Sequence, residues 1–256
     1  MFVQGQDNLS FRVLTWDDLD QKFLEAKNQE QGENDLHLAS PGLWPATLYP
    51  EIFGVPEVWL SLLSQVIRLG NEKDLSETKA PTLSLTEFSS RAKALERCIL
   101  NWDESASTSI VESSTHKSLQ IVNIDWIMLE SMLSALRHAL VIYFYRRIHD
   151  IDPEMLQSKV SKVKDFLFAC KEVCASSGRF VSALTWPAFI AGCEATSDDL
   201  QESFSEWFRL CLQRNGNQSS ARLQRVMEKV WHERRQDCRP STSWLKLLRS
   251  STILYG

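Results

Sequence analysis

The sequence predicts an all-α protein in which eight or nine antiparallel helices pack around a buried central helix, residues 119–149. Three observations predict this class. Apolar residues recur at helical spacing over most of the chain, capping and stop residues separate these runs, and no long alternating polar and apolar run competes with them. The chain has 256 residues, of which 43% are hydrophobic, with nine Trp and twelve Phe, so it can bury a sizeable core and wholesale disorder is excluded.

The first 43 residues predict an acidic N-terminal helix followed by a linker. Thr15 is a suitable N-cap and Asp18 an early carboxylate for a helix over residues 16–27, after which the polar string NQEQGEND interrupts the pattern. The string ASPGLWPATLYPEIFGVP then combines four prolines and two glycines with large apolar residues, which indicates irregular but packed chain. Residues 44–254 are predicted to form a single helical domain.

The next helices begin after Pro56, a residue suited to a first helical turn. Helical spacing continues to Gly70, a good stop, and a second amphipathic stripe runs from Phe88 to Trp102. Residues 103–118 contain eight Ser or Thr in sixteen positions, which predicts a mobile insertion.

The stretch 119–149 is apolar on two faces, so it is predicted to be a helix buried between neighbours. Asp152 and Pro153 supply an N-cap and a first-turn proline for the helix that follows. The same signals predict further helices over 153–177, 186–195, 198–214, 218–236 and 241–250.

The cysteines and the hydropathy pattern suggest an intracellular protein without metal or cofactor. None of the six cysteines stands in the two-residue spacing of zinc ribbons and redox motifs, so we expect reduced thiols. Cys170 and Cys174 lie one helical turn apart, but apolar neighbours favour burial over metal binding. The most apolar stretch carries Arg137 and His138 at its centre, which argues against a membrane span.

Six blocks of sequence resemble, in order, the regulatory domain of fungal-specific transcription factors, in the subgroup of arginine-metabolism and acriflavine-sensitivity regulators. They cover about residues 44–254: FGVPEVWLSLLSQVIRLGNE, FSSRAKALERCILNW, LSALRHALVIYFYRRIHDIDPEMLQ, LTWPAFIAGCEA, VMEKVWHERRQ and SWLKLL.

The resemblance implies a nuclear regulator whose helical domain senses small molecules, dimerises or masks an activation segment. In this family a binuclear zinc cluster with six closely spaced cysteines precedes the helical domain and reads the DNA. The cysteines of this chain do not match that spacing. DNA contact is therefore expected only through a missing or separate zinc-cluster module.

An enzyme is the alternative that the sequence leaves open. A stand-alone cytoplasmic protein of fungal secondary metabolism could cyclise or isomerise a hydrophobic metabolite without a metal. The nucleophile elbow, phosphate-binding glycine loop and metalloprotease motif are absent. The regulator is the preferred interpretation, and a small hydrophobic metabolite and a second copy of the chain are its expected partners.

One candidate site is a polar stripe on the central helix. Glu130, Ser134, His138, Val141 and Tyr145 follow one another at spacings of four, four, three and four, so they share one side of the helix. A polar stripe inside a bundle is where ligands are met. The alternative is that Glu130, His138 and Tyr145 satisfy each other or neighbouring backbone groups in the core.

A second candidate site is the string WPAFIAGCEA, which contributes Trp186, Cys193 and Glu194. We predict that Trp186 and Cys193 join the polar stripe in binding a ligand. In an enzyme, His138 and Glu194 would be the catalytic candidates, with Glu194 acting as a general acid or base. The alternative for Glu194 is a salt bridge, and Arg146 and Arg147 are the expected partners.

Basic residues are concentrated near the C-terminal end. Between Arg209 and Arg249 there are ten basic residues against Glu228, Glu233 and Asp237. A solvated helix surface is the favoured interpretation and a phosphate-contacting stripe the alternative. The acidic net charge of −5 argues against strong DNA binding by the chain alone, so we predict weak and salt-dependent binding.

Overall fold

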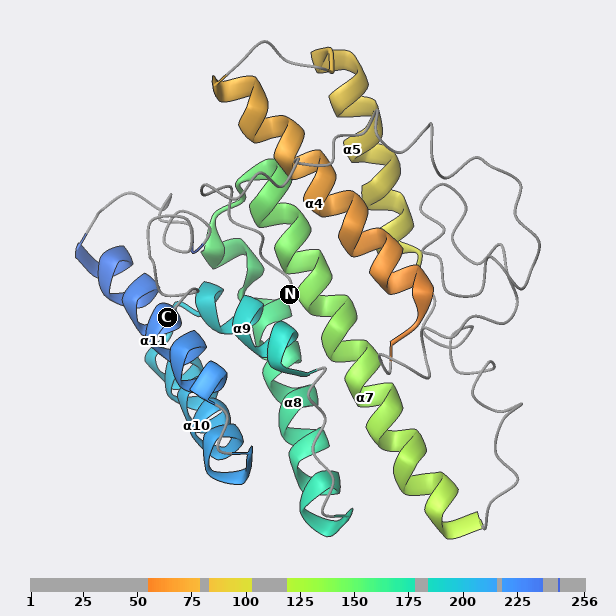
Figure 1. The fold of residues 1–256 in the computed structure, drawn as a ribbon, viewed down its shortest axis with the longest axis vertical. Coiled ribbons are helices and arrows are strands. Elements are labelled where there is room, and N and C mark those ends of the chain that lie inside the picture. The colour runs from red at the N-terminus through yellow and green to blue at the C-terminus, as the bar shows by residue number, and fades with distance from the viewer. Residues whose placement is uncertain are drawn as a thin grey trace. The chain divides into compact units, whose positions relative to one another are not determined.

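The computed structural model describes residues 55–78, 83–102, 119–177, 184–215, 218–236 and 244. These residues form seven α-helices and no strand, which confirms the all-α prediction (Figure 1). The helix predicted at 16–27, the helix predicted at 241–250 except for Trp244, and the insertion predicted at 103–118 lie outside the described residues. The two helices account for the lower helix count. The helices are α4 (Glu57–Thr78), α5 (Leu85–Leu100), α7 (Leu119–Phe144), α8 (Gln157–Ser177), α9 (Thr185–Glu194), α10 (Asp198–Asn215) and α11 (Gln218–Gln236).

Contacts along the chain divide the protein into two compact units, and the single domain over 44–254 stays a prediction. The first unit contains α4, α5, the part of α7 up to Leu133, and residues 147–149. Helix α4 packs against α5 through apolar faces. The buried side chains of these faces include Trp59, Leu62, Leu63, Val66, Leu69, Ala92, Leu95 and Ile99.

The start of α5 is fixed by a capping box. Ser84 Oγ accepts a hydrogen bond from Glu87 N at 3.3 Å, and Glu87 Oε2 accepts one from Ser84 N at 3.0 Å. The hydrogen bonds from the side chain and backbone of Ser84 also lower the pKa of the Glu87 carboxyl below its usual value. Two backbone donors at the helix end are thereby satisfied.

The second unit contains α7 from Ser134 onward together with α8, α9, α10 and α11. Helix α9 is contacted by α8, α10 and α11. Every side chain from Pro187 to Glu194 is buried, which makes this short helix the core of the unit. The sequence predicted a helix over residues 186–195, and α9 begins one residue earlier and ends one residue earlier.

The central helix is buried as predicted from Ser131 to Ile148, whereas Glu130 and His149 at the two ends of this segment are exposed. From Ser131 to Ile148, only Arg137, His138 and Tyr145 are partly accessible, and the rest are buried. Because both faces of this segment are apolar, no side of it is suited to solvent. None of the described helices is both long enough and apolar enough to cross a membrane.

The central helix changes geometry at its end. Residues Tyr145–His149 form a π-helical turn, in which the backbone N–H of Asp150 donates to Tyr145 O. Asp150 adopts a left-handed conformation with φ of 51°, which aspartate tolerates better than most residues. A 3-10 turn, Pro153–Leu156, then leads into α8, and the Asp152 side chain caps it by accepting from Glu154 N at 2.9 Å. The predicted N-cap and first-turn proline are therefore present.

Candidate functional site

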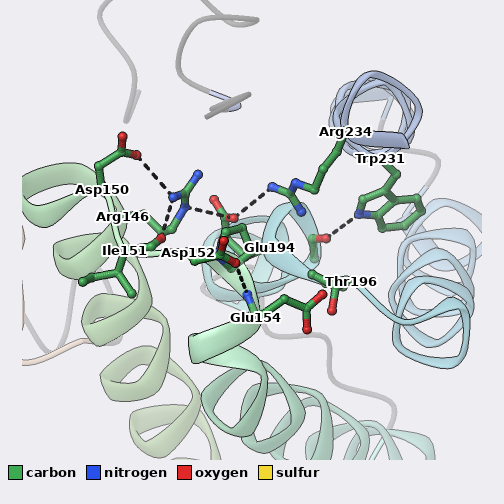
Figure 2. A network of polar contacts seen from close by, with 12 residues as sticks. Arg146, Asp150, Ile151, Asp152, Glu154, Glu194, Thr196, Trp231 and Arg234 are labelled. Carbon is green, nitrogen blue, oxygen red and sulfur yellow. Dashed lines mark hydrogen bonds and ion pairs between the residues drawn. The ribbon is translucent and has the colours of Figure 1, made fainter. Parts of the chain in front are cut away.

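The last residue of α9, Glu194, is a fully buried carboxylate held between two arginines (Figure 2). Arg146 reaches it from the π-helical turn, with Nε 3.1 Å from Glu194 Oε2. Arg234 reaches the same oxygen from the last turn of α11, with Nη2 at 3.0 Å. The side chains of Glu194, Arg146 and Arg234 are 0%, 5% and 14% exposed, so the charges compensate one another largely out of water. We call these three residues the ion cluster.

The ion cluster also fixes the chain that follows the π-helical turn. Arg146 Nη1 donates to the backbone oxygen of Ile151 at 2.6 Å and lies 3.3 Å from Asp150 Oδ1. Asp150 is 56% exposed on its side chain, so this second ion pair is screened by solvent. Breaking the buried pairing with Glu194 is therefore the more costly change, because it leaves a buried charge uncompensated.

The backbone at the end of α9 is satisfied by side chains from other helices. Gln157 of α8 donates through Nε2 to Glu194 O at 2.9 Å and accepts through Oε1 from Thr196 N at 3.2 Å. Its Nε2 also lies 2.7 Å from Pro153 O. One glutamine thus closes the end of α9 and ties it to the start of α8.

Helices α10 and α11 contribute two more caps. Gln201 Nε2 of α10 donates to Ala195 O at 3.0 Å. The indole Nε1 of Trp231 in α11 (Figure 2) donates to Gly192 O at 2.8 Å. Arg235 Nη2 donates in turn to Gln201 Oε1 at 2.5 Å. The carbonyl groups left over at the end of a helix are costly when buried, and here they find partners.

Gly192 allows α11 and α10 to approach α9 closely. A Cβ atom at this position would overlap Met227 Sδ of α11 and would stand 3.3 Å from Phe204 Cγ of α10. Met227 and Phe204 are both fully buried, so neither has free space to retreat into. The glycine in the AGCE string is therefore explained by packing.

The predicted partners of Glu194 were half right. Arg146 pairs with it, but Arg147 belongs to the first unit, where its Nη1 donates to Asp74 Oδ1 of α4 at 2.7 Å. Arg147 crosses α4 at Gly70, where a Cβ atom would overlap the guanidinium group. Successive residues in a helix point about 100° apart, so the two arginines could not both reach Glu194.

Arg234 is the partner that sequence reasoning missed. Its position carries a signal, because Met227, Val230 and Trp231 are buried on α11 and Arg234 falls four residues after Val230 on the same side. An arginine on the buried apolar side of a helix needs an acidic partner, because charged side chains are seldom buried unpaired.

The residues of the polar stripe on the central helix differ in burial and belong to both units. Glu130 is exposed in the first unit, whereas Ser134 is buried and His138 and Tyr145 are half-buried in the second. The His138 ring stacks on Phe166 of α8, with centroids 5.9 Å apart and planes inclined by 15°. Ligand binding by the stripe stays a prediction.

Trp186 and Cys193 lie on α9. The Trp186 ring meets the edge of Tyr143 with centroids 5.9 Å apart, and Trp244 packs between Tyr143 and Phe189. Burial, and secondarily the charge of Glu194, raise the pKa of the Cys193 thiol well above its usual value. Ligand contact by Trp186 and Cys193 stays a prediction.

We expect Cys193 to resist alkylation in the folded protein. Since its pKa is raised in the folded state, the thiol stays protonated, and the thiolate is the reactive form. Cys98 is exposed on α5 and should react with iodoacetamide at pH 8 within minutes. Peptide mass spectrometry measures both sites in one sample, and equal labelling of the two cysteines in the native protein would contradict the described burial.

The same shift sets a pH dependence of stability. A group whose pKa is higher in the folded protein than in the unfolded protein stabilises the fold fully at a pH below its unfolded-state pKa. This stabilisation is lost as the pH rises from there through the folded-state pKa. Stability should therefore fall above about pH 8.5, the usual thiol pKa. Denaturant titrations of Cys193→Ala should show a shallower decline there than the unsubstituted protein.

Chemically, the ion cluster suits a structural role. General acid or base catalysis requires the carboxylate to reach a substrate proton, and Glu194 is wholly enclosed by protein. Within the described ranges, no group of three or more His, Cys, Asp or Glu side chains is placed to hold a metal ion.

Comparison with known proteins identifies the family. The fungal specific transcription factor domain matches residues 5–255. Over 208 aligned residues the chain is 26% identical to arginine metabolism regulation protein II of Saccharomyces cerevisiae. The aligned segment covers 77% of this chain and 22% of the yeast protein. The chain thus spans about a fifth of the length of this relative, and no solved structure matches it. With nearly its whole length matched, the chain belongs to the fungal-specific transcription factor domain family.

Proposed function

We propose that this chain is the regulatory domain of a nuclear transcription regulator. It controls transcription through the conformation of its helices and through its contacts with partner molecules. The observation that carries the proposal is the family match over residues 5–255. Reading of a DNA sequence is assigned to a separate zinc-cluster module, because the family resemblance places that role in a cluster of six closely spaced cysteines and the cysteines of this chain do not match that spacing. The relative named as a regulator of arginine metabolism supports the same role.

The geometry of the second unit suits such a domain. The ion cluster and the glutamine caps connect the π-helical turn, α8, α9, α10 and α11 through directional contacts. Buried polar networks of this kind specify one arrangement of helices, since any other arrangement strands charges or hydrogen-bonding groups. A domain whose output depends on its conformation needs such a defined arrangement.

Small-molecule sensing by the polar stripe belongs to the same proposal. The proposed contacts of a hydrophobic metabolite are Ser134, His138, Tyr145, Trp186 and Cys193, with Glu130 at the exposed end of the stripe. Support comes from the half-buried state of His138 and Tyr145 and from their aromatic neighbours, Phe166 and Phe144. Native mass spectrometry of protein purified from its own host tests for a co-purifying metabolite.

His138→Ala separates ligand binding from a purely structural role. Loss of the ring removes the stack on Phe166, which costs about 0.5–1.5 kcal/mol for an aromatic pair, and it removes any ligand contact. The proposal predicts that the bound mass disappears while the thermal midpoint falls by only a few degrees. Retention of the same ligand per folded molecule would reject the assignment of His138.

A tethered reporter tests the proposed function. The whole chain, fused to a DNA-binding module from an unrelated protein, is placed upstream of a reporter gene in a fungal host. We expect reporter transcription to change at least severalfold relative to the DNA-binding module alone. A fusion that is folded, nuclear and bound to its site, yet leaves transcription unaltered, would reject the proposal.

A further inference from the structure

The outer face of α11 carries a regular row of cationic and polar side chains. Residues 222, 225, 229, 232 and 236 follow one another at spacings of three, four, three and four, so they share one side of the helix. Four of the five are exposed and Arg222 is half-buried. We call this set the basic row: Arg222, Arg225, Lys229, His232 and Gln236.

The row is the solvent side of a helix whose opposite side is anchored. Val226, Met227, Val230 and Trp231 are buried, and α11 packs through them against α9 and α10. Arg234 points inward to Glu194 and is not part of the row. Because the inner face fixes the rotation of α11 about its axis, the row is held outward as a preformed surface.

The charges of the row are weakly compensated. Arg222 and Arg225 form no ion pair with any residue that the structure describes, and Arg225 Nε instead donates to the backbone oxygen of Ala221 at 3.3 Å. Lys229 Nζ lies 3.7 Å from Glu233 Oε1, and both side chains are accessible to water. An exposed pair at this distance is worth little, so a stronger anion can replace the carboxylate.

The geometry points to the basic row as a surface that binds the phosphate backbone of duplex DNA without reading its sequence. Arg222 and Lys229 are seven residues apart, about 10 Å along the helix axis. Arg and Lys side chains are long and flexible, so each of the three cations in this span can reach a separate phosphate. The inference rests on the proposed function, in which a DNA-reading module brings this domain close to DNA, and it adds the part of the surface that faces the duplex.

The expected binding is weak and strongly dependent on salt. Each phosphate neutralised contributes about 0.9 to the slope of log K against log of salt concentration, so three contacts give a slope of about −2.7. Affinity should then fall about 40-fold between 50 and 200 mM KCl. The net charge of −5 opposes strong binding, which confines the measurement to low salt.

The test measures fluorescence anisotropy of a labelled 20-base-pair duplex of arbitrary sequence with the full chain at several KCl concentrations. The triple variant Arg222→Gln, Arg225→Gln, Lys229→Gln is expected to lose at least 10-fold in affinity at 50 mM KCl, with a slope near zero. The control is Lys93→Gln, Arg97→Gln, Lys162→Gln, which removes the same charge from three exposed cations on α5 and α8. This control should retain the slope of the unsubstituted chain.

Several results would overturn the inference. They are undetectable binding at 50 mM KCl, an equal loss of affinity in both triple variants, and tighter binding of a polyglutamate peptide than of DNA at the same salt concentration. The last result would assign the row to an acidic protein partner. The tethered reporter is read separately. A working reporter together with no DNA binding by the unsubstituted chain rejects this inference alone, and a silent reporter together with DNA binding through the basic row rejects the proposed function alone.

Discussion

Glu194→Gln is expected to lower the free energy of unfolding by about 3–5 kcal/mol, the usual cost of removing one partner from a buried charge network. The substitution keeps the size of the side chain, so the loss is not caused by a cavity. It leaves Arg146 and Arg234 buried with no carboxylate between them. Urea titration followed by circular dichroism measures the effect.

Two further variants show whether charge is the cause. Glu202→Gln removes an ion pair with Arg209 whose side chains are 73% and 52% exposed, so its cost should stay within about 1 kcal/mol. Replacing the whole ion cluster by Arg146→Met, Glu194→Leu and Arg234→Met should be close to neutral, since no charge is then buried. A cost of Glu194→Gln as small as that of Glu202→Gln would show that Arg146 and Arg234 tolerate the loss of their carboxylate, which would contradict their described burial.

Trp231→Ala should also cost about 3–5 kcal/mol, the usual range for removing a large buried aromatic ring. Trp231 is buried at the contact of α11 with α9, and its indole satisfies Gly192 O. The variant therefore loses packing and a hydrogen bond together. Thermal melts and urea titrations should both show the loss.

Trp231→Phe divides that loss into its parts. The phenyl ring keeps most of the packing but removes the indole donor, so that Gly192 O keeps only the hydrogen bond from Ala195 N at 3.2 Å. The loss of one hydrogen bond should cost about 0.5–1.5 kcal/mol. A phenylalanine variant as stable as the unsubstituted protein would show that the indole hydrogen bond adds nothing to stability beyond the bond from Ala195 N.

The sequence was sufficient to predict the class of fold because each described helix carries its own local signal. Asp152 and Pro153 mark a helix start, and two apolar faces mark a buried helix, whatever the rest of the chain does. The boundaries near residue 150 were less predictable. A π-helical turn and a left-handed Asp150 depend on contacts such as Arg146 with Ile151 O, which no local pattern encodes.

The candidate site was predictable only in part, for a similar reason. Glu194 and Arg146 could be proposed as partners from residue type, since a buried carboxylate needs a cation. Arg147 was an equally good candidate by that criterion, and only the rotation of the helix separates the two. Arg234 lies 40 residues from Glu194 along the chain, so its pairing follows from how α11 packs on α9.

Regulation, as opposed to catalysis, is the central claim, and sequencing of transcripts after rapid induction tests it most directly. The gene is removed from its own host and then restored under an inducible promoter, with metabolite extracts taken at the same times. We predict that a defined set of transcripts changes within the first hour of induction, before any metabolite does. An unaltered transcript profile together with the return of a missing metabolite would contradict the account and assign the chain to the enzyme alternative.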